Sequence, residues 1–194
     1  MVGIPVIDPG PMTVDEFYAF TDTRPDDEKW ELIGGEPILN ASPSPLHQLI
    51  VRNVIGALLF RERELNAPWM VLPGFGVRVS DNDRPEPDVI VVPYDHRSFD
   101  NRRDRNDVIV AFEVLSPSTE RRDLRWKRTT YPRLPLLTHY VAIAQDAVEA
   151  VIFARDDDFE GRKFRSLDDE IELRSLGISL PIAEIYRDTS SLIV

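Results

Sequence analysis

Three nearly continuous apolar runs constrain the fold of this 194-residue chain more than any other feature of the sequence. They read PDVIVVP at 87–93, DVIVAFEVL at 107–115 and LLTHYVAIA at 136–144. Short runs of this kind, rich in Val and Ile, are typical of strands in a sheet that is covered on both faces. The stretch ERRDLRWKRTTY at 120–131 lies between the last two runs and is predicted to be a helix that ends before the following prolines. The chain is therefore predicted to fold as a mixed α/β protein.

Further elements are expected on either side of these runs. TVDEFYAF at 13–20 begins with a Thr-x-x-Glu capping box and predicts a short helix. KWELIGGEPIL at 29–39 predicts a hairpin around two glycines, and the apolar spacing in 44–64 predicts a long amphipathic helix. WMVLPGFGVRVS at 69–80 is interpreted as another strand, and the tail as an antiparallel meander with a short terminal helix. No repeat or low-complexity linker interrupts the chain, so a single domain over residues 1–194 is expected.

Charge and composition narrow the function classes. The net charge of −11 argues against general attraction to a polyanion, although residues 120–133 hold six cations and two anions. Such a patch is able to contact phosphates locally, and an ordinary solvated helix face explains it as well. The absence of cysteine excludes thiolate metal sites and thiol nucleophiles. No segment has the length of a membrane span or the pattern of a signal peptide, so no membrane association and a cytoplasmic location are expected.

Glu113 is the unusual residue in these strands, because it places a carboxylate inside an apolar run. A buried, unpaired charge is costly. Asp88 begins the preceding run, and consecutive strands usually pair, so the two carboxylates are expected at one edge of the sheet. Two adjacent carboxylates repel each other unless a cation lies between them, and Mg²⁺ or Mn²⁺ prefers oxygen ligands of this kind. The pair therefore predicts a divalent metal site suited to phosphate chemistry.

PEPDVIVV and FEVLSPST, together with MTVDEFYAF, WELIGGEPI, GFGVRV and the closing LPIAEIY, resemble the Uma-type restriction endonuclease family, a branch of the PD-(D/E)XK nuclease superfamily. The resemblance implies a restriction-endonuclease-like core: a mixed β-sheet flanked by helices, with an N-terminal hairpin and a C-terminal meander. It implies that Asp88 and Glu113 bind the metal, with Val114 as a further ligand through its carbonyl. The superfamily lysine would fall at Leu115, which is a departure from the pattern.

The family's helix supplies a substitute, since Asp123, Lys127 and Tyr131 are spaced by four and share one face. The resemblance implies that Lys127 is catalytic and that Glu31 belongs to the acidic cluster. It also suggests substrate contacts for His47 and Tyr131, and the basic patch of the same helix makes Arg121, Arg122 and Arg125 candidates for phosphate contacts. Other readings stay open for several of them. Asp123 and Lys127 could form a surface ion pair beside a core tyrosine, Glu31 could be a solvated hairpin residue, and His47 could cap or pack at its helix start.

The function expected from the sequence is metal-dependent hydrolysis of phosphodiester bonds in nucleic acid, as an endonuclease on DNA with Mg²⁺ or Mn²⁺. The alternative is a catalytically inactive nuclease-like module that binds nucleic acid or protein, because Leu115 replaces the motif lysine and the chain is acidic. Cutting both strands of a duplex usually requires two active sites, so a homodimer is a further expectation, with the apolar tail as a possible interface.

Overall fold

The computed structural model describes residues 10–94, 103–115 and 120–189, and it describes the side chains of this last range from residue 124 onward. Four α-helices occur in the described residues: α1 (Val14–Thr21), α2 (Pro45–Leu65), α3 (Glu120–Thr130) and α4 (Ile182–Ile185). The strands are β1 (Trp30–Ile33), β2 (Glu36–Leu39), β3 (Trp69–Pro73), β4 (Val89–Pro93), β5 (Val110–Leu115), β6 (His139–Ala144), β7 (Ala150–Ala154), β8 (Gly161–Phe164), β9 (Glu170–Leu173) and β10 (Ile178–Pro181). Three short 3-10 turns complete these elements: η1 (Tyr131–Arg133), η2 (Arg155–Asp157) and η3 (Arg174–Leu176).

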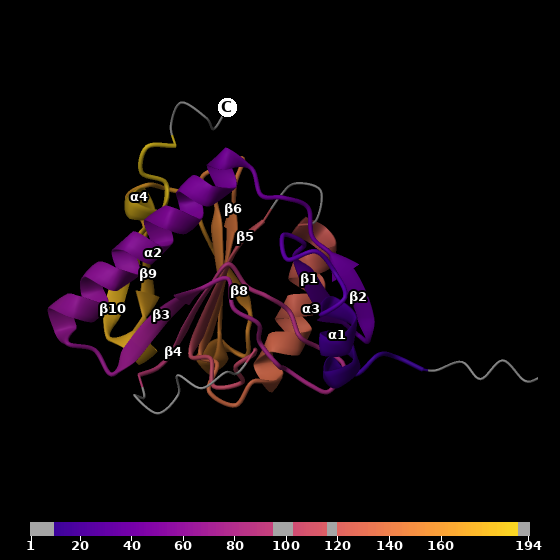
Figure 1. The fold of residues 1–194 in the computed structure, drawn as a ribbon. Helices are drawn as coiled ribbons and strands as arrows, with labels where there is room; N and C mark the ends of the chain where they lie inside the picture. Colours follow the sequence, from indigo (N-terminus) through magenta and orange to yellow (C-terminus); the bar gives the residue numbers. More distant parts are fainter. Residues whose placement is uncertain (1–9, 95–102, 116–119, 190–194) are drawn as a thin grey trace, which may run out of the picture.

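A six-stranded mixed sheet forms the centre of the molecule, in the order β3-β4-β5-β6-β7-β8 (Figure 1). The neighbouring strands are antiparallel except for β5 and β6, which run parallel because α3 connects them across one face. The three apolar runs of the sequence thus form β4, β5 and β6, as predicted. The two-stranded hairpin β1–β2 and the pair β9–β10 lie outside this sheet.

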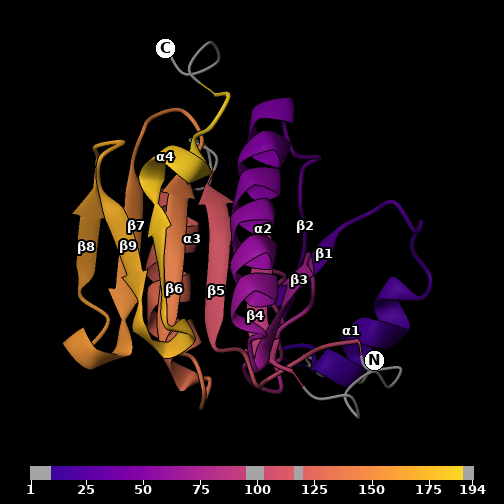
Figure 2. The ribbon, with the colours of Figure 1, turned by 90° about the vertical axis from the view of Figure 1, so that its left-hand side faces the viewer.

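Each face of the sheet is covered, which explains why its central strands carry almost no polar residues. α2, α4 and the β9–β10 pair cover one face (Figure 2), and α3 covers the other. Along β5 the side chains alternate between the two cores: Phe112 and Val114 pack under α2, whereas Ala111 and Leu115 face the side of α3. The same alternation directs Glu113 to the side of α3.

The local signals explain several element boundaries. Thr13 and Glu16 form the predicted capping box of α1. Gly34 and Gly35 both have positive φ, 59° and 82°, which suits the tight turn between β1 and β2. The expected strand over 69–80 ends at Pro73, and this boundary corrects the sequence interpretation. The chain turns at Gly74, whose φ of 49° is incompatible with a continued strand.

The outer edge of β3 is partly blocked against pairing with another strand. The backbone N–H of Val71 donates to the Glu62 carboxylate of α2 at 3.2 Å, and Pro73 has no N–H to offer.

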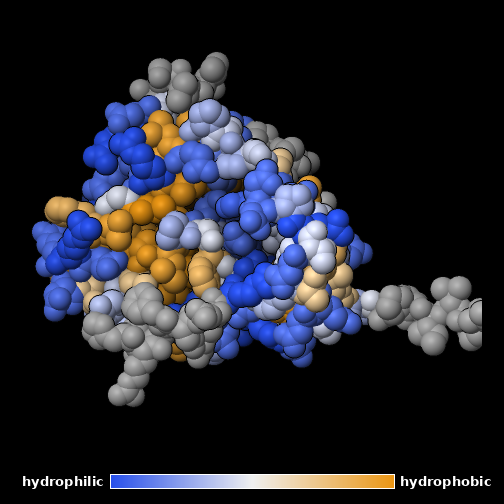
Figure 3. Space-filling view, in the orientation of Figure 1, coloured by the Kyte–Doolittle hydropathy of each residue, from blue (hydrophilic) through white to orange (hydrophobic). Residues whose placement is uncertain are grey.

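Apolar side chains reach the surface along α2 (Figure 3), where Phe60 is 63% exposed. Within the described ranges, no helix has the length and apolarity needed to cross a membrane.

The Asn53 side chain of α2 is hydrogen-bonded to the backbone at the end of α4. Its side-chain amide is 1% exposed and donates to the carbonyls of Ile185 and Arg187 at 3.0 and 2.7 Å. Replacement by leucine is expected to lower the free energy of unfolding by about 1–3 kcal/mol, because two carbonyls lose their donor. Urea unfolding measures the loss, with Arg52→Ala on the exposed face of the same helix as the control that leaves stability nearly unchanged. A loss below about 0.5 kcal/mol would contradict this role.

Candidate functional site

Asp88 and Glu113 meet at one end of the sheet, as the sequence predicted. In the antiparallel pairing of β4 with β5, Val89 lies opposite Phe112, so one further step sets Asp88 opposite Glu113. Asp88 Oδ2 accepts a hydrogen bond from the backbone N–H of Val114 at 2.8 Å. Both carboxylates line a single cavity of about 340 Å³. The two acids therefore share one site and do not point to opposite faces of the sheet.

Glu113 is held by three side chains. Its Oε1 accepts from the hydroxyl of Tyr131 at 2.6 Å, and its Oε2 accepts from the hydroxyl of Tyr140 at 3.1 Å. Lys127 Nζ lies 2.6 Å from the same Oε2. The carboxylate is 3% exposed, so these partners replace the water that it loses on folding.

Burial raises the pKa of Glu113 above its ordinary range, the Lys127 ammonium opposes this rise, and the Glu31 carboxylate adds to it. Burial and the neighbouring Glu113 carboxylate likewise raise the pKa of Tyr131 well above its usual value, so its phenol stays protonated and donates. The Lys127 ammonium is thus the buried cation that favours the charged form of Glu113.

Lys127 reaches this site from α3, whose last turn brings its side chain over β5. It is 8% exposed and lies 3.9 Å from Glu31 Oε1 as well as in contact with Glu113. Leu115, at the place of the superfamily lysine, is 7% exposed and packs in the core on the side of α3. Lys127 of α3 therefore lies close to Glu113, and position 115 of the strand, where the superfamily has its lysine, is occupied by a core leucine.

The hairpin contributes a second acidic group. Glu31 of β1 is 7% exposed, and its Oε1 accepts from the backbone N–H of Glu86 at 2.6 Å. Glu86 forms ion pairs with Arg84 at 3.0 Å and with Lys29 at 3.8 Å. Glu31 is therefore a buried member of the cavity wall and not a solvated hairpin residue.

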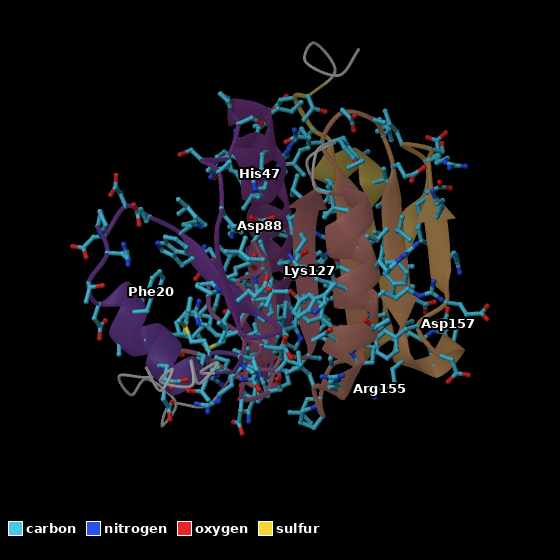
Figure 4. All side chains as sticks on the ribbon, turned by 90° about the vertical axis from the view of Figure 1, so that its right-hand side faces the viewer. Phe20, His47, Asp88, Lys127, Arg155 and Asp157 are labelled. Carbon is cyan, nitrogen blue, oxygen red and sulfur yellow. The ribbon has the colours of Figure 1, made fainter. Side chains whose placement is uncertain are left out.

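His47 lies in the first turn of α2, directly above Asp88. Its backbone N–H is capped by the Ser44 hydroxyl at 3.1 Å, so Ser44 is the N-cap of the helix. Its ring Nε2 lies 3.0 Å from Asp88 Oδ1. Figure 4 shows His47, Asp88 and Lys127 following one another between α2 and α3. The histidine is thereby part of the cavity.

The donor set of the cavity fits a hard divalent cation. Four carboxylates line it, Glu31, Glu86, Asp88 and Glu113, against two lysines, Lys29 and Lys127. Among the residues that the structure describes, no three His, Asp or Glu side chains converge closely enough to hold a metal by themselves. Mg²⁺ commonly binds proteins through one or two carboxylates and keeps several of its waters, so a pair of acids is sufficient for it.

The remaining predicted residues fall in different places. Tyr131 is fully buried behind Glu113 and does not line the cavity, which corrects the expected substrate contact. Arg125 is exposed on α3, away from the cavity wall. The side chains of Arg121, Arg122 and Asp123 lie outside the described residues.

Sequence reasoning missed four residues of this site: Lys29, Glu86, Tyr140 and Gln145. Glu86 stands two positions before Asp88 in PEPD, and Lys29 stands two positions before Glu31 in KWE, so both had a local signal. Tyr140 and Gln145 come from a segment far from the acids in the chain. Only the pairing of β5 with β6 brings Tyr140 to Glu113.

Comparisons with known proteins agree with this architecture. The structure is similar to the crystal structure of a protein from Anabaena variabilis described as a "putative nuclease", with a TM-score of 0.72 and 16% sequence identity, over 91% of this chain and 98% of that one. An uncharacterised protein of Synechocystis sp. is 36% identical over 76 residues, which span 39% of this chain and 40% of that protein. The sequence profile of the Uma2 family, described as "Putative restriction endonuclease", matches residues 14–183. The chain therefore belongs to the Uma2 family.

Proposed function

We propose that this protein is a divalent-metal-dependent endonuclease that hydrolyses phosphodiester bonds in DNA. The observation that carries the proposal is the meeting of Asp88, Glu113 and Lys127 in one cavity, since two acids and a lysine are the groups that this hydrolysis requires. Membership of the Uma2 family supports the same reaction class.

Each residue has a defined task in this proposal. Asp88 and Glu113 would hold Mg²⁺ or Mn²⁺, with Val114 as a further ligand through its carbonyl. When bound, the ion supplies an activated water and neutralises charge on the phosphate. Lys127 orients the attacking water and stabilises the negative charge that develops on the phosphate oxygens. Glu31 keeps Lys127 close to the site, and His47 holds Asp88 in place through the contact of its Nε2 with Asp88 Oδ1.

Two residues are assigned to positioning and not to the reaction. Tyr131 and Tyr140 donate to different oxygens of Glu113, so the carboxylate has one fixed orientation toward the cavity. Removing either hydroxyl with Tyr131→Phe or Tyr140→Phe is expected to weaken Mn²⁺ binding by about 10-fold to 100-fold. Isothermal titration with Mn²⁺ measures this, and unchanged affinity in both variants would contradict the assignment.

Removal of the metal tests the proposed function. Purified protein is expected to nick or linearise plasmid DNA with Mg²⁺ and to stop when EDTA is added, with Ca²⁺ as the non-supporting control ion. Titration with Mn²⁺ is expected to show binding in the absence of DNA. Binding of DNA without any metal binding would instead identify the inactive module that Leu115 suggests.

The expectation of a homodimer remains a prediction. In the described part of the tail, most apolar side chains are buried in the chain itself, with Ile171, Leu173 and Leu180 each 0% exposed, whereas Leu167 is 51% exposed. Light scattering at several protein concentrations measures the oligomeric state.

A further inference from the structure

The outer face of α2 carries apolar side chains that the fold does not bury. Figure 2 shows α2 on the outside of the central sheet, and Figure 3 shows apolar residues along it. Phe60 is 63% exposed, and it lines an open hollow together with Gly56, Leu59, Arg63 and Glu64. An exposed apolar patch with a charged rim is typical of a surface that binds another protein.

Gly56 is an unexpected residue in the middle of this helix. Glycine in a helix interior costs about 0.8–1 kcal/mol relative to alanine. Beyond its own turn of the helix, a Cβ added at position 56 would meet no atom within 4 Å, so packing in the described chain does not require glycine there. The missing side chain instead leaves room on the outer face, where a large side chain of another molecule could approach the helix closely.

The outer face has a repeating order that matches itself when it is reversed. Arg52, Gly56, Phe60 and Glu64 are spaced by four and form one ridge along the helix surface. In an antiparallel pair of these ridges with its twofold axis at position 58, Phe60 of each copy lies opposite Gly56 of the other. Arg52 and Glu64 lie six residues on either side of position 58, so the same axis sets each arginine level with the glutamate of the other copy.

The charges of the ridge favour a second copy of this chain as the occupant. Arg52 and Glu64 are both exposed, and neither forms an ion pair with another described residue of its own chain. Opposite charges that meet across an interface fix its register. A parallel pair of ridges would set Arg52 against Arg52 and Glu64 against Glu64, which disfavours that arrangement. Arg63 also lines the hollow, and its aliphatic stem can cover apolar surface while its charge stays in water.

We infer that the outer face of α2 is the interface of a twofold-symmetric homodimer, in which the ridges of two copies pack antiparallel with Phe60 of each copy against Gly56 of the other. The inference goes beyond the proposed function and does not depend on it. Gln48, the last residue of α2 that lines the cavity, lies 12 residues before Phe60, which is about 18 Å along the helix. Substitution of Phe60 therefore leaves the residues of the cavity unchanged.

Sedimentation velocity at a series of protein concentrations tests the inference. The wild-type chain is expected to pass from monomer to dimer as its concentration rises. Phe60→Asp is expected to raise the dissociation constant of the dimer at least about 30-fold, because aromatic side chains at the centre of an interface dominate its affinity. Leu167→Asp changes an apolar side chain of the tail that is 51% exposed, and as the matched control it should leave the constant unchanged.

Reversal of the charges tests the register. Removal of one exposed charge has a small effect, so the test reverses the charge and thereby creates repulsion. Arg52→Glu and Glu64→Arg are each expected to weaken the dimer by about 10-fold. The double variant restores opposite charges across the antiparallel pair and is expected to recover the wild-type constant within about 3-fold. Two losses that add in the double variant would overturn the antiparallel register.

Gly56→Leu separates a role in the interface from a role in folding. Leucine is the better helix former, so urea unfolding at a concentration that keeps the chain monomeric should show no loss of stability. The new side chain fills the place of Phe60 from the other copy, and it is expected to weaken the dimer at least about 10-fold.

Three results would overturn the inference. The first is a wild-type chain that stays monomeric up to roughly 1 mM. The second is a dimer that Phe60→Asp and Gly56→Leu leave unchanged, or that Leu167→Asp dissociates instead. The third is a monomer that binds a different protein through Phe60, because the occupant would then not be a second copy. Dimerisation as expected, without any cleavage of DNA, would support the inference while the proposed function fails alone.

Discussion

Lys127→Met is expected to lower the free energy of unfolding by about 3–5 kcal/mol at neutral pH, because it leaves the carboxylate of Glu113 buried without its cation. Glu113→Gln should cost a similar amount for the opposite reason, since Lys127 then loses the carboxylate at 2.6 Å and the acid at Glu31 lies farther away, at 3.9 Å. The double variant removes both charges. It is expected to lose at least about 2 kcal/mol less than the sum of the single losses.

The loss in Lys127→Met should depend on pH with a definite sign. The folded-state pKa of Glu113 is already raised by burial, and loss of the neighbouring ammonium raises it further. A carboxyl whose pKa is raised on folding binds its proton more tightly in the folded state. The contribution of the Glu113 carboxyl to stability is therefore greatest below the ordinary glutamate pKa of about 4.3. This contribution falls as the pH rises through the folded-state pKa of Glu113. Lys127→Met is expected to recover part of its stability when the pH is lowered to about 4.

Urea unfolding of the four proteins at pH 7 and pH 4 measures both effects. Arg125→Met, on the exposed face of the same helix, is the matched control and should change stability by less than about 0.5 kcal/mol. Strictly additive losses, or a loss in Lys127→Met that does not shrink at low pH, would show that the ion pair does not exist in the folded protein.

Asp88→Asn is expected to reduce metal-dependent cleavage by more than about 100-fold. Partners that merely orient a metal ligand typically contribute about 10-fold to 100-fold, so loss of a ligand itself should exceed that range. The change removes a charge and preserves the shape, and asparagine retains an oxygen to accept from the Val114 N–H. Stability should consequently remain nearly unchanged.

Initial rates at saturating DNA, together with Mn²⁺ titration, separate metal binding from the later steps. Glu184→Gln is the control for loss of a carboxylate, because Glu184 pairs with Arg61 at 2.9 Å and does not line the cavity. Cleavage by Asp88→Asn at the wild-type rate would place the reaction elsewhere or in a contaminant.

Local patterns account for the parts of the fold that the sequence predicted. The apolar runs became β4, β5 and β6 because a strand covered on both faces has no position for a solvated side chain. The capping box of α1 and the glycine turn after β1 depend on only a few neighbouring residues, so both were predicted from the sequence. The strand over 69–80 was predicted too long, since the apolar alternation continues beyond the turn at Gly74.

By itself, the sequence predicted that two acids at the facing ends of consecutive strands would share one place. The resemblance to the nuclease family, and no local pattern, suggested that Lys127 on the next helix replaces the lysine missing at Leu115. Only the tertiary structure decided which groups surround them. The contact of Tyr140 with Glu113, the wall built by Trp30 and Gln145, and the burial of Tyr131 depend on how distant segments pack. Strand order, register and helix packing create such long-range neighbours, because the free energy that selects them is summed over the whole core and no local stretch encodes it.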